Sequence, residues 1–227
     1  MINHFLKVYL YKWRMTMTPK QQAYEALSHT LIKELEKRNM KAEYFPSKED
    51  CLNRILNLIP TGSIVSNGGS STLTEIGLLA AIQSGDYEYI DRSSASTPEE
   101  KRILFSKIVM ADYYLMSTNA LTLDGQLINI DGNGNRIACL VQGPEHVFIV
   151  CGMNKIVSTV EEGIHRTRNI AAPPNVKRLK YNTPCSMLGR CGDCLSTDCI
   201  CSHIVITRRS KHPERIWIFL VGEELGY

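Results

Sequence analysis

The stretch 63–83, SIVSNGGSSTLTEIGLLAAIQ, determines how the rest of the chain is interpreted. Residues 63–66 predict a strand, and residues 67–72 predict a glycine-rich turn. Residues 73–83 predict a helix, and the box formed by Thr72 and Glu75 is expected to cap its N-terminus. A strand that turns at glycines into a helix is the repeating unit of α/β folds. This stretch therefore indicates an α/β domain.

The same alternation of strand and helix continues on both sides of this stretch. Further helices are expected over 18–39, 47–59, 97–110 and 157–170, the last ended by Ala171–Pro174. Further strands are expected over 42–45, 87–91, 113–117, 147–151, 204–207 and 216–221. Residues 121–123 and 126–130 flank Asp124 and Gly125, which predict a hairpin turn. The fold class predicted is α/β, with a mostly parallel sheet flanked by helices.

Composition narrows the class of protein. The chain has 227 residues, of which 22% are charged and 44% hydrophobic, values typical of a globular domain. Its net charge of +3 is too small to predict nucleic-acid binding, and no apolar run approaches the roughly 20 residues of a membrane span. Residues 1–16 do not resemble a secretory signal, and we interpret them as an N-terminal extension. We expect a cytoplasmic protein with one domain over 17–227.

The sharpest chemical feature is a cysteine-rich loop over 181–203. It contains five of the eight cysteines of the chain: Cys185, Cys191, Cys194, Cys199 and Cys201. The C-x2-C spacing of Cys191 and Cys194 lets one turn of backbone offer two thiolates to one metal centre. The spacings are compatible with a 4Fe–4S cluster or with zinc. A metal-free thiol loop is the alternative, and in a reducing compartment disulfides are less expected.

Three turns that follow predicted strands are candidate ligand sites, because ligands of α/β sheets bind beyond the carboxyl ends of the strands. The first turn offers backbone N–H groups and hydroxyls that attract anions, at Gly68, Gly69, Ser70, Ser71 and Thr72. The second carries Asn119 and Asp124, and the third carries Asn154 and Lys155. Glu75, Asn119 and Lys155 are the candidate catalytic residues. Ordinary turns and a solvated lysine remain the alternatives.

Taken together, five motifs resemble the LUD domain family, which includes the LutC-like and YkgG-like lactate utilization proteins. The motifs are 66–77 SNGGSSTLTEIG, 118–129 TNALTLDGQLIN, 134–138 GNRIA, 152–157 GMNKIV and 221–227 VGEELGY. The resemblance covers about 18–227 and implies a fold like the NagB/RpiA/CoA-transferase group. In similar stand-alone members arginine usually occupies the position of Cys199. The resemblance thus implies Cys185, Cys191, Cys194 and Cys201 as ligands, with Cys199 as an alternate.

The resemblance also implies a function, as a component of an iron–sulfur-linked oxidation of lactate to pyruvate. It supplies no mechanism, so whether the chain is itself an enzyme or a subunit of an oxidoreductase stays open. One alternative is an isomerase, hydrolase or transferase acting on a small anionic substrate, either phosphorylated or acyl. A second is a metabolite-binding protein with structural zinc. Expected partners are a small anionic metabolite and iron–sulfur subunits, and a homodimer is a further option. No flavin or nicotinamide motif is visible in the sequence.

Overall fold

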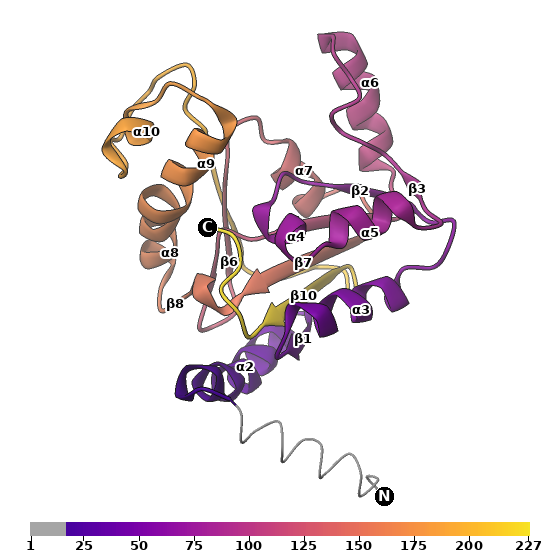
Figure 1. Ribbon diagram of the computed structural model, residues 1–227, viewed down its shortest axis with the longest axis vertical. Helices are drawn as coiled ribbons and strands as arrows, with labels where there is room; N and C mark the ends of the chain where they lie inside the picture. The colour runs from indigo at the N-terminus through magenta and orange to yellow at the C-terminus, as the bar shows by residue number, and fades with distance from the viewer. Residues whose placement is uncertain (1–16) are drawn as a thin grey trace, which may run out of the picture.

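A parallel sheet forms the centre of the molecule, as the alternating pattern predicts. The computed structural model describes residues 17–227, and the extension predicted over 1–16 lies outside them. The six strands of this sheet all run parallel, in the order β1-β10-β7-β4-β2-β3 (Figure 1). Their bounds are Lys41–Phe45 (β1), Ile216–Val221 (β10), His146–Gly152 (β7), Tyr113–Ser117 (β4), Ile64–Asn67 (β2) and Glu88–Tyr89 (β3). The prediction of a mostly parallel sheet flanked by helices is confirmed.

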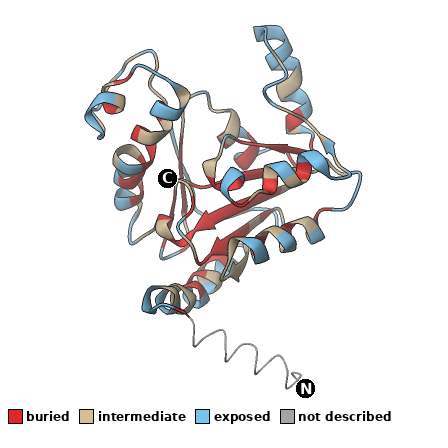
Figure 2. Cartoon of the chain, in the orientation of Figure 1, coloured by how far each residue is buried: buried red, intermediate tan, exposed pale blue. Residues whose placement is uncertain are grey.

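Helices cover both faces of this sheet because successive strand residues point to opposite sides. In β7, Ile149 packs into one apolar cluster, whereas its neighbours Phe148 and Val150 pack into the other. Residues of α2 (Pro19–Lys37), α6 (Pro98–Val109) and α7 (Asn135–Val141) join the first cluster. Residues of α3 (Lys48–Leu58), α4 (Ser71–Glu75) and α5 (Leu78–Ser84) join the second. Figure 2 shows the buried strands enclosed by helices with exposed outer faces.

A second, four-stranded sheet lies beside the first, and the sequence analysis did not predict it. Its order is β8-β5-β6-β9, with strands at Ile156–Val157 (β8), Ala120–Thr122 (β5), Leu127–Asp131 (β6) and His203–Thr207 (β9). The hairpin predicted around Asp124 and Gly125 is confirmed, because β5 and β6 pair antiparallel. Gly125 has a φ of +86°, and a Cβ there would lie 3.1 Å from the backbone of α2. This turn therefore needs glycine.

The helix predicted over 73–83 is two helices, α4 and α5, separated by Gly77 with a φ of +76°. The cap is not Thr72. Ser70 caps α4, because its side chain accepts a hydrogen bond of 3.3 Å from the Leu73 amide. The threonine–proline starts at Thr18 and Thr97 are capping boxes, as predicted.

The prediction that prolines end a helix near residue 170 is wrong. The helix begins as α8 (Val160–Arg166), passes through a π-helical turn (η2, Thr167–Ala171) and continues as α9 (Ala172–Leu179). Proline lacks an N–H and its ring crowds the preceding turn of an α-helix. A π turn changes the local hydrogen-bond pattern just before Pro173, so the helix continues instead of ending.

The remaining short elements connect these layers. They are a single 3-10 turn (η1, Met153–Lys155) and the helix α10 (Pro184–Leu188). None of the helices within 17–227 is both long enough and apolar enough to cross a membrane.

Candidate functional site

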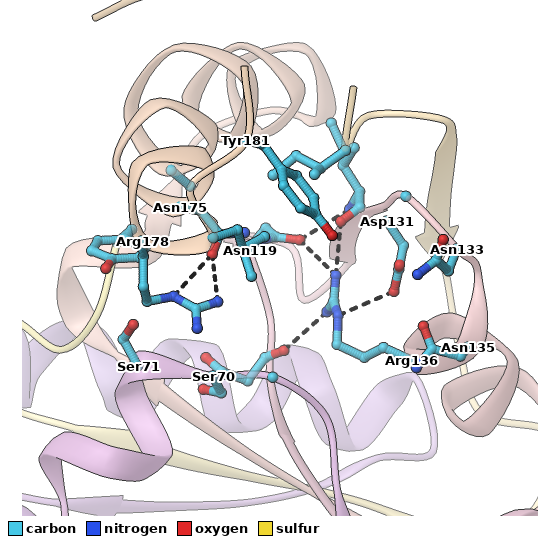
Figure 3. Close-up of a pocket in the computed structure, with 18 of the residues that line it drawn as sticks. Ser70, Ser71, Asn119, Asp131, Asn133, Asn135, Arg136, Asn175, Arg178 and Tyr181 are labelled. Atoms are coloured by element: carbon cyan, nitrogen blue, oxygen red, sulfur yellow. Dashed lines mark hydrogen bonds and ion pairs between the residues drawn. The ribbon is translucent and has the colours of Figure 1, made fainter. Parts of the chain in front are cut away.

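A cavity of about 370 Å³ opens where β2, β4 and β7 end. This is the edge at which ligands of parallel sheets bind. The glycine turn, residues 117–119 at the end of β4 and before β5, and η1 line one side of it, while α9 and residues 197–200 of the cysteine-rich loop line another. Figure 3 shows Ser70 and Ser71 across the cavity from Asn175 and Tyr181. Four cationic side chains and two carboxylates face it: Arg92, Arg136, Lys155, Arg178, Asp131 and Asp198. The cavity thus has a cationic wall.

Lys155 lies at the buried end of this cavity with only 3% of its surface exposed. Its Nζ donates to Thr72 Oγ1 at 2.8 Å and to Ser117 Oγ at 2.9 Å. Burial lowers the pKa of Lys155 to about 8, against a smaller opposing effect of the Cys151 thiol. Such a lysine can give and take a proton near neutral pH, which an ordinary surface lysine does poorly.

The segment Leu225–Tyr227 closes one side of the Lys155 pocket. The Leu225 amide donates to Asn154 Oδ1 at 3.1 Å, and the Gly226 amide donates to Glu75 Oε2 at 2.7 Å. Gly226 has a φ of +61°, and a Cβ there would lie 3.3 Å from Lys155 Nζ. Glu75 and Asn154 therefore hold this segment in place, and only Tyr227 of its residues lines the cavity.

Arg136 of α7 is the structural centre of the polar wall. Its Nη1 donates to Asn129 Oδ1 at 2.5 Å, and its Nη2 donates to Asn119 Oδ1 at 3.0 Å. Its Nε lies 3.4 Å from Asp131 Oδ2, and burial lowers the pKa of the guanidinium. Asn119 Oδ1 also accepts from the Ile130 amide at 3.0 Å. Asn119 thus orients Arg136 and β6 through its carbonyl oxygen.

Two other guanidinium groups keep donors available. Arg178 donates to Asn175 Oδ1 from Nε and Nη2, at 3.2 and 2.7 Å, and its Nη1 has no acceptor in the described part of the chain. Arg92 makes no hydrogen bond or ion pair within residues 17–227, and its guanidinium lies against Gly69. Figure 3 shows the Arg178 side chain turned toward Ser70 and Ser71. These free donors can bind a carboxylate or phosphate.

The structure brings most of the predicted ligand residues to this cavity. Those that line it are Gly69, Ser70, Ser71, Thr72, Asn119 and Lys155. Gly68 lies just behind the wall, where a Cβ would approach Arg136 Cδ at 3.0 Å. Glu75 and Asn154 lie behind Lys155 and hold Leu225 and Gly226.

Asp124 lies away from the cavity. Its Oδ2 accepts from Arg38 Nη2 of α2 at 2.6 Å, and Thr122 Oγ1 donates to its Oδ1 at 2.5 Å. These hydrogen bonds, with Thr122 the larger effect, lower the pKa of Asp124. Its visible role is to fix the hairpin against α2.

Sequence reasoning missed the three arginines of the cavity wall, Arg92, Arg136 and Arg178, and also Tyr227. Arg136 stands inside the motif GNRIA, which could have pointed to it. Arg92 and Arg178 carry no local signal, because they come from a loop after β3 and from a helix that was predicted to have ended.

Cys199 of the cysteine-rich loop lines the cavity. Burial raises the pKa of Cys201 to about 12, and the thiols of Cys199, Cys191 and Cys185 add to this effect. Hydrogen bonds from Ser196 lower the pKa of Cys194. The donors are of the kind that iron–sulfur clusters and zinc need. Within 17–227, however, no three metal-ligating side chains converge on one point, so the arrangement does not fit a bound metal as it stands.

Comparisons with known proteins give a family and a fold. The family model described as the LUD domain matches residues 29–221. A crystal structure of a DUF162 family protein from Deinococcus radiodurans is similar, with a TM-score of 0.51 and 14% identity over 87% of this chain and 98% of that one. Ribose 5-phosphate isomerase A from Neisseria gonorrhoeae gives a partial match, with a TM-score of 0.32 and 12% identity over 50% of this chain and 54% of that one. No curated protein matches the sequence.

Proposed function

Since this chain belongs to the LUD domain family, we propose that it is a lactate utilization protein. In this proposal it binds a small 2-hydroxy acid in the central cavity and takes part in its oxidation to the 2-oxo acid. One observation carries the proposal: free guanidinium donors on Arg92 and Arg178 share a cavity with the buried amine of Lys155.

The cationic wall suits the carboxylate of such a substrate. A guanidinium binds a carboxylate through two parallel hydrogen bonds, and these are stronger than bonds between neutral groups. The hydroxyls of Ser70 and Ser71 face the same space and can bind further oxygens of the substrate. A cavity of about 370 Å³ lies in the range of small-molecule sites.

Lys155 supplies the acid–base function of the proposal. Oxidation of a 2-hydroxy acid removes two electrons and two protons, one of them from the hydroxyl. With a pKa of about 8, about one Lys155 in ten is neutral at pH 7 and can accept that proton. Thr72 and Ser117 hold the amine at the buried end of the cavity. We assign the two electrons, and the proton of the substrate C–H bond, to an iron–sulfur partner subunit.

We further propose that Cys185, Cys191, Cys194 and Cys201 turn toward a common centre and hold a 4Fe–4S cluster or a zinc ion. The spacing of these cysteines supports this, since all four lie in one loop and Cys191-x2-Cys194 can offer two thiolates from one turn of backbone. Zinc would only stabilise the fold of the loop, whereas a 4Fe–4S cluster could also carry an electron.

Iron, sulfide and zinc analysis of protein purified without oxygen tests the metal proposal. Metal bound to the wild type should be lost in Cys194→Ser and retained in Cys199→Ser, the matched control within the same loop. Wild-type protein free of all three elements would refute it. One equivalent of zinc without any turnover would favour a metabolite-binding protein with structural zinc.

Calorimetric titration with lactate and pyruvate tests the binding proposal. Arg178→Met should weaken binding by about tenfold or more, because it removes a charge-assisted contact. Arg38→Met is the control, because Arg38 pairs with Asp124 outside the cavity. If the wild type binds neither acid, or if both variants bind equally well, the cavity does not bind these acids as proposed.

A second candidate is an isomerase, hydrolase or transferase acting on a phosphorylated or acyl substrate. The placement of Lys155 favours it, since a buried amine held by Thr72 and Ser117 can move protons without a redox partner. Proton NMR in D2O tests this candidate with sugar phosphates. Exchange of a substrate C–H in the wild type and its loss in Lys155→Met would support it, and no exchange in the wild type would exclude proton abstraction.

A further inference from the structure

A groove of about 650 Å³ opens between α2, β8 and α8. Most of the side chains that line it are apolar: Tyr24, Leu27, Leu123, Met153, Ile156, Val157 and Ile170. Tyr24, Leu27 and Ile156 pack against the first apolar cluster, whereas Leu123 is 40% exposed and Ile170 is 57% exposed. The groove therefore leaves apolar surface uncovered beside the core, and covering that surface would be favourable.

The N-terminal end of α2 lies at the edge of this groove. Lys20, Tyr24 and Leu27 follow one another at intervals of four and three residues, so they share one face of α2. The Lys20 amine lies 5.7 Å from the centre of the Tyr24 ring and pairs with Glu224, which also lines the groove. Met17 comes three residues before Lys20 and is buried. Residues 1–16 therefore join the described chain next to the groove.

We propose that residues 1–16 fold back over this groove and fill it with the side chains of Phe5, Tyr9 and Trp13. These three residues recur at every fourth position, and Leu6 and Leu10 lie beside them in sequence, so the segment can present a continuous apolar face. Its reach is sufficient. Sixteen residues span up to about 50 Å when extended, whereas the α2 wall of the groove rises only about 10 Å.

The charges of the segment and the groove are complementary as well. Residues 1–16 contain no acidic residue, and their basic side chains include Lys7, Lys12 and Arg14. The groove is lined by the exposed carboxylates of Glu162 and Glu224, and Glu162 has no cationic partner among residues 17–227.

The groove lining also contains a cation, Arg166. Its buried guanidinium is already taken up by hydrogen bonds to the backbone carbonyls of Asn119, Asn154 and Tyr227. It therefore does not cancel the attraction of the two exposed carboxylates for a basic segment. An apolar and basic segment that is tethered at the edge of the groove is the occupant that this surface suits.

Tryptic cleavage of the full chain tests the proposal, with mass spectrometry to identify the cuts. Trypsin should cut after Lys7, Lys12 and Arg14 only while the segment is out of the groove, so the rate follows the undocked population. Ile170→Glu places a charge in the groove and should raise this rate by about tenfold or more. Ile103→Glu is the matched control and should leave the rate unchanged, because Ile103 is 53% exposed on α6, outside the groove. Circular dichroism of each variant separates undocking from unfolding.

The fluorescence of Trp13 gives a second measurement. The chain has two tryptophans, so Trp217→Phe leaves Trp13 as the single probe. Its emission should be shifted to shorter wavelength and shielded from acrylamide, and adding Ile170→Glu should remove both effects.

Three results would overturn the proposal. One is a Trp13 side chain that is as accessible to acrylamide in the native protein as in urea. Another is equal cleavage of Ile170→Glu and Ile103→Glu. The third is protection that increases with protein concentration, which would show that the segment of a second copy fills the groove instead.

Discussion

The buried amine of Lys155 gives the most decisive prediction about stability. The substitution is Lys155→Met, which keeps an unbranched side chain one atom shorter and removes the amine with its charge. In the folded protein burial lowers the pKa of Lys155 from 10.5 to about 8. The unfolded chain therefore binds more protons than the folded chain between these two pH values, and the free energy of unfolding rises with pH in that window.

The size of the effect follows from the shift. Lowering the pKa of Lys155 from 10.5 to about 8 destabilises the wild type by about 3 kcal/mol at and below pH 7. Of this, about 2 kcal/mol should be regained by pH 9.5. Lys155→Met has no such group and should lack this gain. Its loss of hydrogen bonds to Thr72 and Ser117 is nearly independent of pH. The difference in free energy of unfolding between wild type and Lys155→Met should therefore change by about 2 kcal/mol from pH 7 to pH 9.5.

Urea unfolding of both proteins at pH 7 and pH 9.5 measures this difference. The neighbouring Cys151 stays neutral over this range, because burial raises its pKa to about 11. Other groups titrate equally in both proteins and cancel. If wild type and Lys155→Met show the same dependence on pH, then Lys155 is not the perturbed base described above.

Three further substitutions, with Gly62→Ala as a control for the first, test how packing and helix capping stabilise the fold. In thermal melts, Gly226→Ala should lower the free energy of unfolding by about 1–3 kcal/mol because its Cβ would meet Thr72 Oγ1 at 2.5 Å. Gly62 has a φ of +77° and no atom within 4 Å of a Cβ built there, so Gly62→Ala should lower the free energy of unfolding by less. Arg136→Met should lower the free energy of unfolding, measured by urea titration, by about 3–5 kcal/mol, because the buried acceptors on Asn129 and Asn119 lose their donor. A loss below about 1 kcal/mol would show that Arg136 does not stabilise the fold in this way. Thr97→Ala should cost about 1 kcal/mol through loss of the α6 cap, and unchanged unfolding would show that the cap contributes nothing.

The sequence predicts the parallel sheet well, because each strand and helix carries its own local signal. Thr18 and Thr97 mark helix starts that side-chain chemistry enforces. Thr72 was wrongly predicted to be a helix cap because it has the same local signature. Its hydroxyl instead accepts a hydrogen bond from Lys155, far away in sequence. Only the tertiary contact reveals that Ser70 is the cap.

The candidate site was predicted in part, for a related reason. The turns after β2, β4 and β7 meet at one edge of the sheet, so Ser70, Asn119 and Lys155 could be grouped from topology alone. Arg92 and Arg178 could not, because their position depends on a loop and on a helix that runs on through two prolines. Asp124 was placed with the site because turn residues and ligand residues look alike in sequence.

The position of β10 has a consequence for the synthesis of this protein. β10 is the last strand of the six in sequence, yet it lies between β1 and β7, and within residues 17–227 it is the strand with which β1 pairs. A growing chain therefore cannot close the sheet until residues 216–221 have left the ribosome. Until then the edges of β1 and β7 stay open, and open edges invite pairing with other chains. Newly made protein should depend on chaperones during this interval, and a chain truncated before Ile216 should fail to fold.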